Sequence, residues 1–141
     1  MKVVEDLIRS NKFKSIIDVG CGDGRFVFEM ARKFPNVKIT GIDYSKRAIA
    51  LAKAMNPEGK YEAVNILDHE NFVGKYDILT LVEVLEHIPP HLLEEFILGC
   101  RRILNRGGCL IATVPHKNKR VQDKHYQHFD KETMDRYITK E

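Results

Sequence analysis

The sequence has few of the residues and patterns that mark a special class of protein. It contains no tryptophan and only three cysteines, Cys21, Cys100 and Cys109, a set too small and too scattered for a disulfide framework or a zinc site. No apolar run reaches the roughly 18 residues that a membrane-spanning helix needs, and residues 1–6 lack the apolar segment of a secretion signal. These absences favour a protein of a reducing, cytoplasmic setting that makes no contact with a membrane.

The chain also lacks a strong excess of charge of either sign. It has 23 basic and 20 acidic residues, a net charge of +3, so bulk charge does not predict nucleic-acid binding. Its 141 residues are 43% hydrophobic and 30% charged, which is the composition of an ordinary globular protein. We therefore expect residues 1–141 to form a single domain.

Apolar segments rich in β-branched residues alternate with amphipathic segments along the chain. This alternation is typical of βαβ units around a mostly parallel sheet. We predict strands at 15–19, 37–42, 61–66, 76–82 and 109–114. We predict helices at 26–33, 46–55 and 91–104, and a short one that begins at Asp130. The predicted fold is α/β, a Rossmann-like, doubly wound and mostly parallel sheet of about five strands.

A glycine-rich segment directly follows the first predicted strand. It reads DVGCGDGR at 18–25 and continues at once into a predicted helix. Glycines allow a tight turn and the close approach of a ligand, while the free N–H groups at the helix start face that ligand. The segment lacks the Gly-Lys-Ser/Thr ending of a P-loop, and Arg25 replaces the third glycine of a dinucleotide fingerprint. Asp43, 19 residues after Gly24, is placed to accept ribose hydroxyls, so the pattern indicates a nucleotide-type site.

These segments resemble those of the class I S-adenosylmethionine-dependent methyltransferases of the small-molecule type. The resemblance rests on DVGCGDGR at 18–25, GIDYS at 41–45, KYDIL at 75–79, EVLEHI at 83–88 and RRILNRGGCLIATVP at 101–115. It implies an enzyme that moves a methyl group from S-adenosylmethionine to a small-molecule acceptor and leaves S-adenosylhomocysteine.

The resemblance also implies which residues contact the cofactor. Gly20, Gly22 and Gly24 would wrap its methionyl and ribose parts, with Cys21 a small residue between them. The other implied contacts are Asp18 with the amino group, Asp43 with the ribose hydroxyls, Tyr44 with the adenine ring, Asn65 and Ile66 (or Asp68) with the adenine end, and Val82 and Glu83 with the methionine end.

A second set of residues suggests an alternative chemistry. Glu83, Glu86 and His87 stand at i, i+3 and i+4, so on a helical turn they would point together toward the mouth of the site. With His128 they would suffice for a divalent metal, and they then resemble metal-dependent enzymes that methylate the 2′ hydroxyl at the 3′ end of small RNAs. Segment 125–130 departs from that family's pattern, so we do not favour the metal or a nucleic-acid partner. Without a metal, His128 and His87 are the candidates for a general base.

Two further alternatives stay open: a non-catalytic cofactor-binding fragment that needs a partner chain, and, at the level of the fold, an NAD-dependent dehydrogenase. The resembled family usually has a seven-stranded sheet, so five strands imply a C-terminally truncated version with an uncovered edge. An open edge invites pairing with another chain. We therefore expect either a homo-oligomer formed through that edge or a chain that is part of a longer protein.

Overall fold

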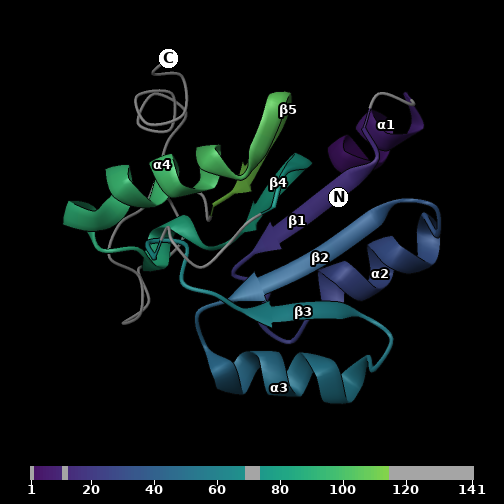
Figure 1. Cartoon of the computed structure of the whole chain (residues 1–141), viewed down its shortest axis with the longest axis horizontal. Coiled ribbons are helices and arrows are strands. Elements are labelled where there is room, and N and C mark those ends of the chain that lie inside the picture. Colours follow the sequence, from purple (N-terminus) through teal and green to yellow (C-terminus); the bar gives the residue numbers. More distant parts are fainter. Residues whose placement is uncertain (1, 11–12, 69–73, 115–141) are drawn as a thin grey trace.

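A parallel sheet of five strands lies at the centre of the structure, a computed structural model that describes residues 2–10, 13–68 and 74–114 (Figure 1). The strands are β1 (Ser15–Val19), β2 (Lys38–Asp43), β3 (Lys60–Ala63), β4 (Tyr76–Val82) and β5 (Leu104–Thr113). Their order in the sheet is β3-β2-β1-β4-β5, and every neighbouring pair is parallel. The predicted doubly wound sheet is confirmed.

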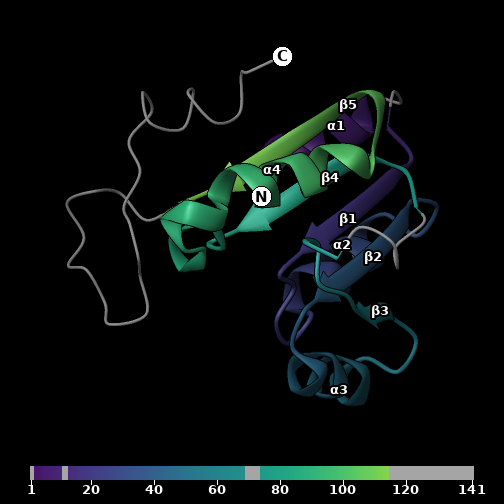
Figure 2. The same cartoon turned by 60° about the vertical axis from the view of Figure 1, so that its left-hand side comes forward.

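Helices cover both faces of this sheet. They are α1 (Lys2–Arg9), α2 (Arg25–Lys33), α3 (Lys46–Met55) and α4 (Leu93–Arg102), with short 3₁₀ turns η1 (Leu85–His87) and η2 (Pro90–Leu92) before α4. Apolar residues of α1, α2 and α3 pack together on one face, and those of α4 pack on the other. Figure 2 shows α4 lying over β4 and β5.

The strand β1 illustrates why the sheet is apolar on both sides. Successive side chains of a strand point to opposite faces. Ile16 belongs to the same core cluster as Val27 of α2, whereas its neighbour Ile17 belongs to the cluster that contains Phe96 of α4, and neither isoleucine is exposed. A parallel sheet covered on both faces therefore needs nearly continuous apolar strands, which is the pattern that predicted it.

The helix α1 lies outside the elements predicted from the sequence. Val4 and Ile8, one helical turn apart, are both buried against the sheet, while the rest of this short helix is mostly charged. Four of its eight residues, Val3, Val4, Leu7 and Ile8, are apolar and recur at helical spacing, but the pattern covers only two turns, and the burial of Val4 and Ile8 secures the element. Within the described ranges, no helix is long and apolar enough to cross a membrane.

Strand β5 begins five residues earlier than the predicted 109–114. Leu104 pairs with Tyr76, and a register shift separates this pair from the Ile78–Cys109 pair. The irregular stretch contains Gly107 with φ of 78°, so the glycines interrupt the ladder instead of preceding it. The predicted helix 91–104 is correspondingly shorter, since residues up to Leu92 form η2 and residues from Leu104 join the sheet.

Strand β3 ends at Ala63, three residues before the predicted end. A turn at Asn65 stops the strand, because the Asn65 side chain accepts the N–H of Leu67 at 3.1 Å and its carbonyl accepts the N–H of Asp68 at 2.9 Å. The other predicted strands and the first two helices agree with the structure to within a residue. The helix predicted from Asp130 lies outside the described residues.

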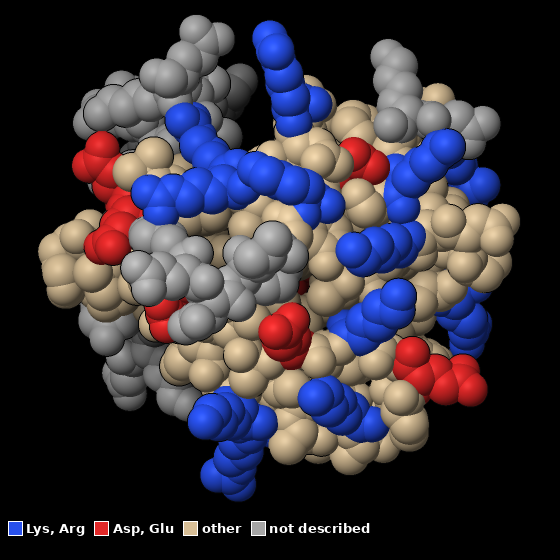
Figure 3. Space-filling view, in the orientation of Figure 1, with Lys and Arg blue, Asp and Glu red and all other residues tan. Residues whose placement is uncertain are grey.

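Charged side chains of both signs occupy the surface. Figure 3 shows Lys and Arg spread over one face of the molecule, with Asp and Glu between them. This distribution is in line with the nearly balanced charge of the sequence.

Asp77 joins three strands at the amino edge of the sheet. Its Oδ2 accepts the backbone N–H groups of Lys14 at 2.8 Å and Ser15 at 3.1 Å, and its Oδ1 accepts the side-chain amide of Asn105 at 2.8 Å. Burial by itself would raise the pKa of Asp77, but these hydrogen bonds outweigh it and the pKa lies below the ordinary value. The carboxylate thus clamps the starts of β1, β4 and β5.

We expect Asp77→Ala to lower the free energy of unfolding by about 1–2 kcal/mol at neutral pH. Because the folded-state pKa is depressed, this stabilisation is present above the unfolded pKa and disappears as the pH falls through the folded one. Urea unfolding at about pH 7 and about pH 3 measures the difference. Asp6→Ala, at an exposed position on α1, is the control. An equal loss at both pH values would contradict the role of the ionised carboxylate.

Candidate functional site

The sheet reverses its direction of growth between β1 and β4. From β1 the chain builds outward through β2 to β3, and it then returns to place β4 on the other side of β1. A crevice forms at the carboxyl ends of the strands at such a switch point and is the usual ligand site of this architecture. The glycine-rich segment follows β1, Asp43 ends β2 and Val82 ends β4, so the structure brings these predicted residues to one edge.

The glycine loop folds back onto the end of β2. Gly20, Gly22 and Gly24 have φ of 76°, 55° and 78°, a left-handed conformation that favours glycine. The N–H groups of Gly20 and Cys21 both donate to the carbonyl of Ile42, at 2.8 and 3.0 Å. Nothing lies within 4 Å of where a Gly22 Cβ would be, so the loop presents open backbone there to an incoming group.

Asp43 connects this loop to the helix that follows β2. Its Oδ2 accepts the N–H of Gly22 at 3.0 Å, and its Oδ1 accepts the N–H of Ser45 at 2.9 Å. Ser45 in turn caps α3 by accepting the N–H of Ala48 at 3.2 Å. An ionised carboxylate has about four lone-pair sites, so Asp43 keeps acceptor capacity for a ligand with two hydroxyls.

Tyr44, the next residue, carries an exposed ring. Its side chain is 81% exposed, the most of any large hydrophobic side chain in the described residues. Aromatic rings are usually buried, and an exposed ring beside a polar cleft offers a surface for stacking.

Asp18 is a buried acid on β1, the strand next to β2, which ends in Asp43. It is 2% exposed and accepts the Thr80 hydroxyl at 2.7 Å, directly across the β1–β4 pairing. Burial, together with the charge of Asp43, raises the pKa of Asp18 to about 7 against the opposing effect of the Thr80 bond. Sequence reasoning missed Thr80, although a threonine inside the otherwise apolar segment 78–82 was a usable signal.

Cys21 is a packing residue of the loop. Burial, with the nearby charges of Asp18 and Asp43, raises the pKa of the Cys21 thiol to about 12. A thiol in this environment stays protonated near neutral pH and is a poor nucleophile.

The turn after β4 differs from the prediction. Glu83 has φ of 52°, the only non-glycine residue with positive φ among those described, and its N–H donates to the Thr113 carbonyl at 3.0 Å. This bond extends the β4–β5 pairing by one residue and prevents a helical turn from starting at Glu83. Glu83 and His87 are consequently exposed whereas Glu86 is fully buried, so the expectation that the three side chains point together is wrong.

Glu86 is the least satisfied polar group of the site region. Neither of its carboxylate oxygens has a hydrogen-bond partner among the described residues, although the side chain is completely buried. A buried carboxylate without a partner is energetically costly and marks a place that needs a hydrogen-bond donor.

No cluster of three or more His, Cys, Asp or Glu side chains in the described part of the chain is arranged to hold a metal ion. His128 lies outside the described residues.

The remaining predicted contacts lie near the carboxyl edge. Asn65 is exposed just beyond β3, where its side-chain oxygen already accepts one N–H. Ile66 is 7% exposed and packs into the core, which leaves its backbone for a ligand. Val82 is partly buried as the last residue of β4.

Comparisons with known proteins agree with this architecture. Residues 17–110, more than half of the chain, match a family model described as a methyltransferase domain. The chain is 30% identical over 113 residues to a ubiquinone biosynthesis O-methyltransferase of Sodalis glossinidius, covering 77% of this chain and 44% of that protein. It is 33% identical over 111 residues to the protein of the same name from Vibrio parahaemolyticus, covering 74% and 45%.

A solved structure gives the same fold. The plantazolicin methyltransferase BamL, crystallised with a triazolic desmethylPZN analog and SAH, has a TM-score of 0.62 at 22% identity, covering 70% of this chain and 36% of that one. The chain spans less than half the length of the two curated relatives described above.

We expect Asp18→Asn to stabilise the protein more at about pH 8 than at about pH 4.5, by at least about 3 °C in Tm. The raised folded-state pKa means that stability is lost as the pH rises from the unfolded pKa toward about 7, because the buried carboxyl must then ionise. Asparagine keeps the oxygen that accepts from Thr80 and stays neutral. Thermal unfolding monitored by circular dichroism measures the effect, with Asp23→Asn on the exposed part of the loop as control. A pH-independent change in Tm would refute the assignment.

Proposed function

The chain belongs to the methyltransferase domain family of class I, S-adenosylmethionine-dependent enzymes, and from that membership we propose that it transfers a methyl group from S-adenosylmethionine to a small-molecule acceptor. The observation that carries the proposal is the Asp43 carboxylate, which binds the glycine loop through Gly22 and lies beside the exposed Tyr44 ring. A carboxylate and an aromatic surface at this switch point suit a nucleoside. The names of the O-methyltransferase relatives support a small-molecule acceptor with an oxygen nucleophile.

The described residues fit such a cofactor. Asp43 has lone pairs left for the ribose hydroxyls, and Tyr44 offers a face for adenine. The glycine loop presents bare backbone at Gly22 toward the methionyl part. The buried Asp18 would orient the amino group through a water molecule.

Further contacts complete the proposed cofactor site. Asn65 and the backbone of Ile66 would meet the adenine end, and the backbone at Val82 and Glu83 the methionine end.

When bound, S-adenosylmethionine supplies a methyl group on a sulfonium, which an acceptor nucleophile takes while S-adenosylhomocysteine leaves. The protein's own task is mainly placement, because holding two reactants in line lowers the barrier without strong acid or base catalysis. The strained Glu83 fixes the backbone at the end of β4, where the methyl group would lie. His87, exposed on η1, is the described candidate for accepting a proton from the acceptor; His128 is the other candidate.

We also propose a cytoplasmic setting and self-association through β5. Cys21, Cys100 and Cys109 are free thiols, as expected in a reducing compartment. Strand β5 pairs only with β4 among the described strands, and an unpaired strand edge of this kind can pair with another chain.

We expect Asp43→Ala to weaken binding of S-adenosylhomocysteine about 10- to 100-fold, because a carboxylate that accepts from two hydroxyls is lost. Isothermal titration calorimetry gives the affinity, and circular dichroism confirms that the variant is folded. Asp43→Asn keeps one acceptor oxygen and should fall between wild type and Asp43→Ala. Glu62→Ala, at an exposed position of β3, is the control. Unchanged affinity in Asp43→Ala would remove the basis of the proposal.

We expect Tyr44→Ala to weaken the same binding about three- to tenfold, because a stacking contact is lost. The melting temperature should stay unchanged, since the ring is 81% exposed in the absence of a ligand. The control is Leu51→Ala, which likewise removes exposed apolar surface, at a half-exposed position on α3. Wild-type affinity in Tyr44→Ala would place the adenine elsewhere.

A further inference from the structure

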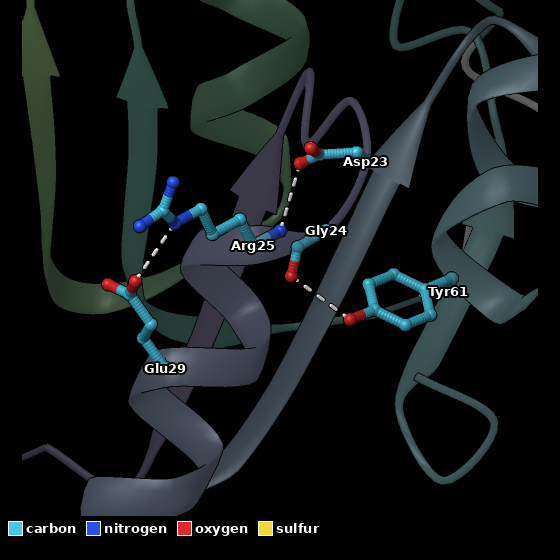
Figure 4. Close-up of polar contacts among 5 residues, drawn as sticks. All are labelled: Asp23, Gly24, Arg25, Glu29 and Tyr61. Carbon is cyan, nitrogen blue, oxygen red and sulfur yellow. Dashed lines mark hydrogen bonds and ion pairs between the residues drawn. The ribbon is translucent and has the colours of Figure 1, made fainter. Parts of the chain in front are cut away.

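Tyr61 is a buried polar residue that the proposed cofactor contacts do not use. It lies on β3, is 6% exposed, and reaches across the sheet edge to the glycine loop. Its hydroxyl donates to the Gly24 carbonyl at 3.1 Å (Figure 4). It also accepts a hydrogen bond from the side-chain amide of Asn56 at 3.0 Å. These two hydrogen bonds connect the end of α3 to the glycine loop through the Tyr61 side chain on β3.

The Gly24 carbonyl lies where the glycine loop ends and α2 begins. Gly24 is the N-cap residue of α2, adopts a left-handed conformation and provides no side chain to cap the helix. Its carbonyl accepts the N–H of Phe28 at 2.9 Å as well as the Tyr61 hydroxyl. Tyr61 therefore binds the loop carbonyl that also accepts the hydrogen bond from Phe28 in the first turn of α2.

The Tyr61 ring fits a space left by three glycines from separate segments. A Cβ on Gly24 would lie 2.5 Å from the ring, and one on Gly41 of β2 would lie 3.0 Å from it. A Cβ on Gly59, in the turn before β3, would clash with the ring as well. Contact with the loop, with β2 and with its own turn fixes both the ring and the hydroxyl, so the bond to Gly24 is made by a preorganised group.

We propose that Tyr61 is a positioning residue for the cofactor: its hydroxyl, held by Asn56, fixes the Gly24 carbonyl and thereby keeps the glycine loop in its ligand-binding conformation. The inference rests on the proposed function and adds a residue that touches no ligand. The loop contains three left-handed glycines, and glycine has more conformational freedom to lose than any other residue. An external anchor reduces the freedom that ligand binding would otherwise have to remove.

The test replaces only the hydroxyl, in Tyr61→Phe. We expect the Kd for S-adenosylhomocysteine to rise about three- to tenfold. The variant lacks the one or two hydrogen bonds of the hydroxyl that hold the loop in place before the ligand binds, so ligand binding must order the loop. The matched control is Tyr76→Phe, which removes a tyrosine hydroxyl that donates at 3.1 Å to Thr40, inside the same sheet but away from the loop. Tyr76→Phe should lower Tm to a similar extent and leave Kd unchanged. Equal Kd changes in both variants, or none in Tyr61→Phe, would overturn the proposal.

A second readout needs no ligand. Hydrogen exchange of the amides at 20–26 should be faster in Tyr61→Phe than in wild type or Tyr76→Phe, because the loop has lost its anchor. Asn56→Ala should produce a smaller change in the same direction, and adding it to Tyr61→Phe should produce no further change. If wild type does not bind S-adenosylhomocysteine, the proposed function fails, and exchange still decides whether Tyr61 anchors the loop. Unaltered exchange in Tyr61→Phe would refute the anchor.

Discussion

The carboxylate of Asp43 is the interaction on which the site depends. One side chain accepts a hydrogen bond from the glycine loop at Gly22 and another from the start of α3 at Ser45. Because the acceptor is charged and the donors are backbone N–H groups, these bonds are stronger than neutral ones. They add polar contacts between two segments whose buried apolar residues, Cys21 of the loop and Ile49 of α3, belong to one core cluster. Without this carboxylate the loop would keep only its bonds to the Ile42 carbonyl and the Tyr61 hydroxyl, and ordering its middle at Gly22 would cost more conformational entropy.

Asp18 and Glu86 show what the fold tolerates around that site. Both acids are buried, one with the Thr80 hydroxyl as its partner and the other with none in the described part of the chain. An apolar parallel sheet excludes such groups unless a function retains them. Both acids lie at the carboxyl edge of the sheet, whereas the well-satisfied Asp77 lies at the amino edge. The carboxyl end is therefore suited to ligands and the amino end to stability.

Local patterns were sufficient to predict β1, β2, β4 and the glycine loop, because apolar runs and glycine spacing act within a few residues. The turn at Glu83 was predicted wrongly because its conformation depends on Thr113, 30 residues later. Helix α1 was missed although Val3, Val4, Leu7 and Ile8 stand at helical spacing, because the pattern extends over only eight residues. The contact of Tyr61 with Gly24 was not predictable, since no pattern in one sequence reveals that two residues 37 apart share a hydrogen bond.

The ring of Tyr61 also constrains how this chain can vary in evolution. Gly41 does not have a positive φ, so its backbone alone would accept alanine, but a Cβ there would lie 2.9 Å from the Cys21 Sγ and 3.0 Å from the Tyr61 ring. A smaller residue at 61 would remove one of these two close contacts but give up the hydroxyl that reaches Gly24. Positions 21, 41, 59 and 61 should therefore change together or not at all, and an alignment of close homologues would show them as a covarying group although they lie in the glycine loop, on β2, in a turn and on β3.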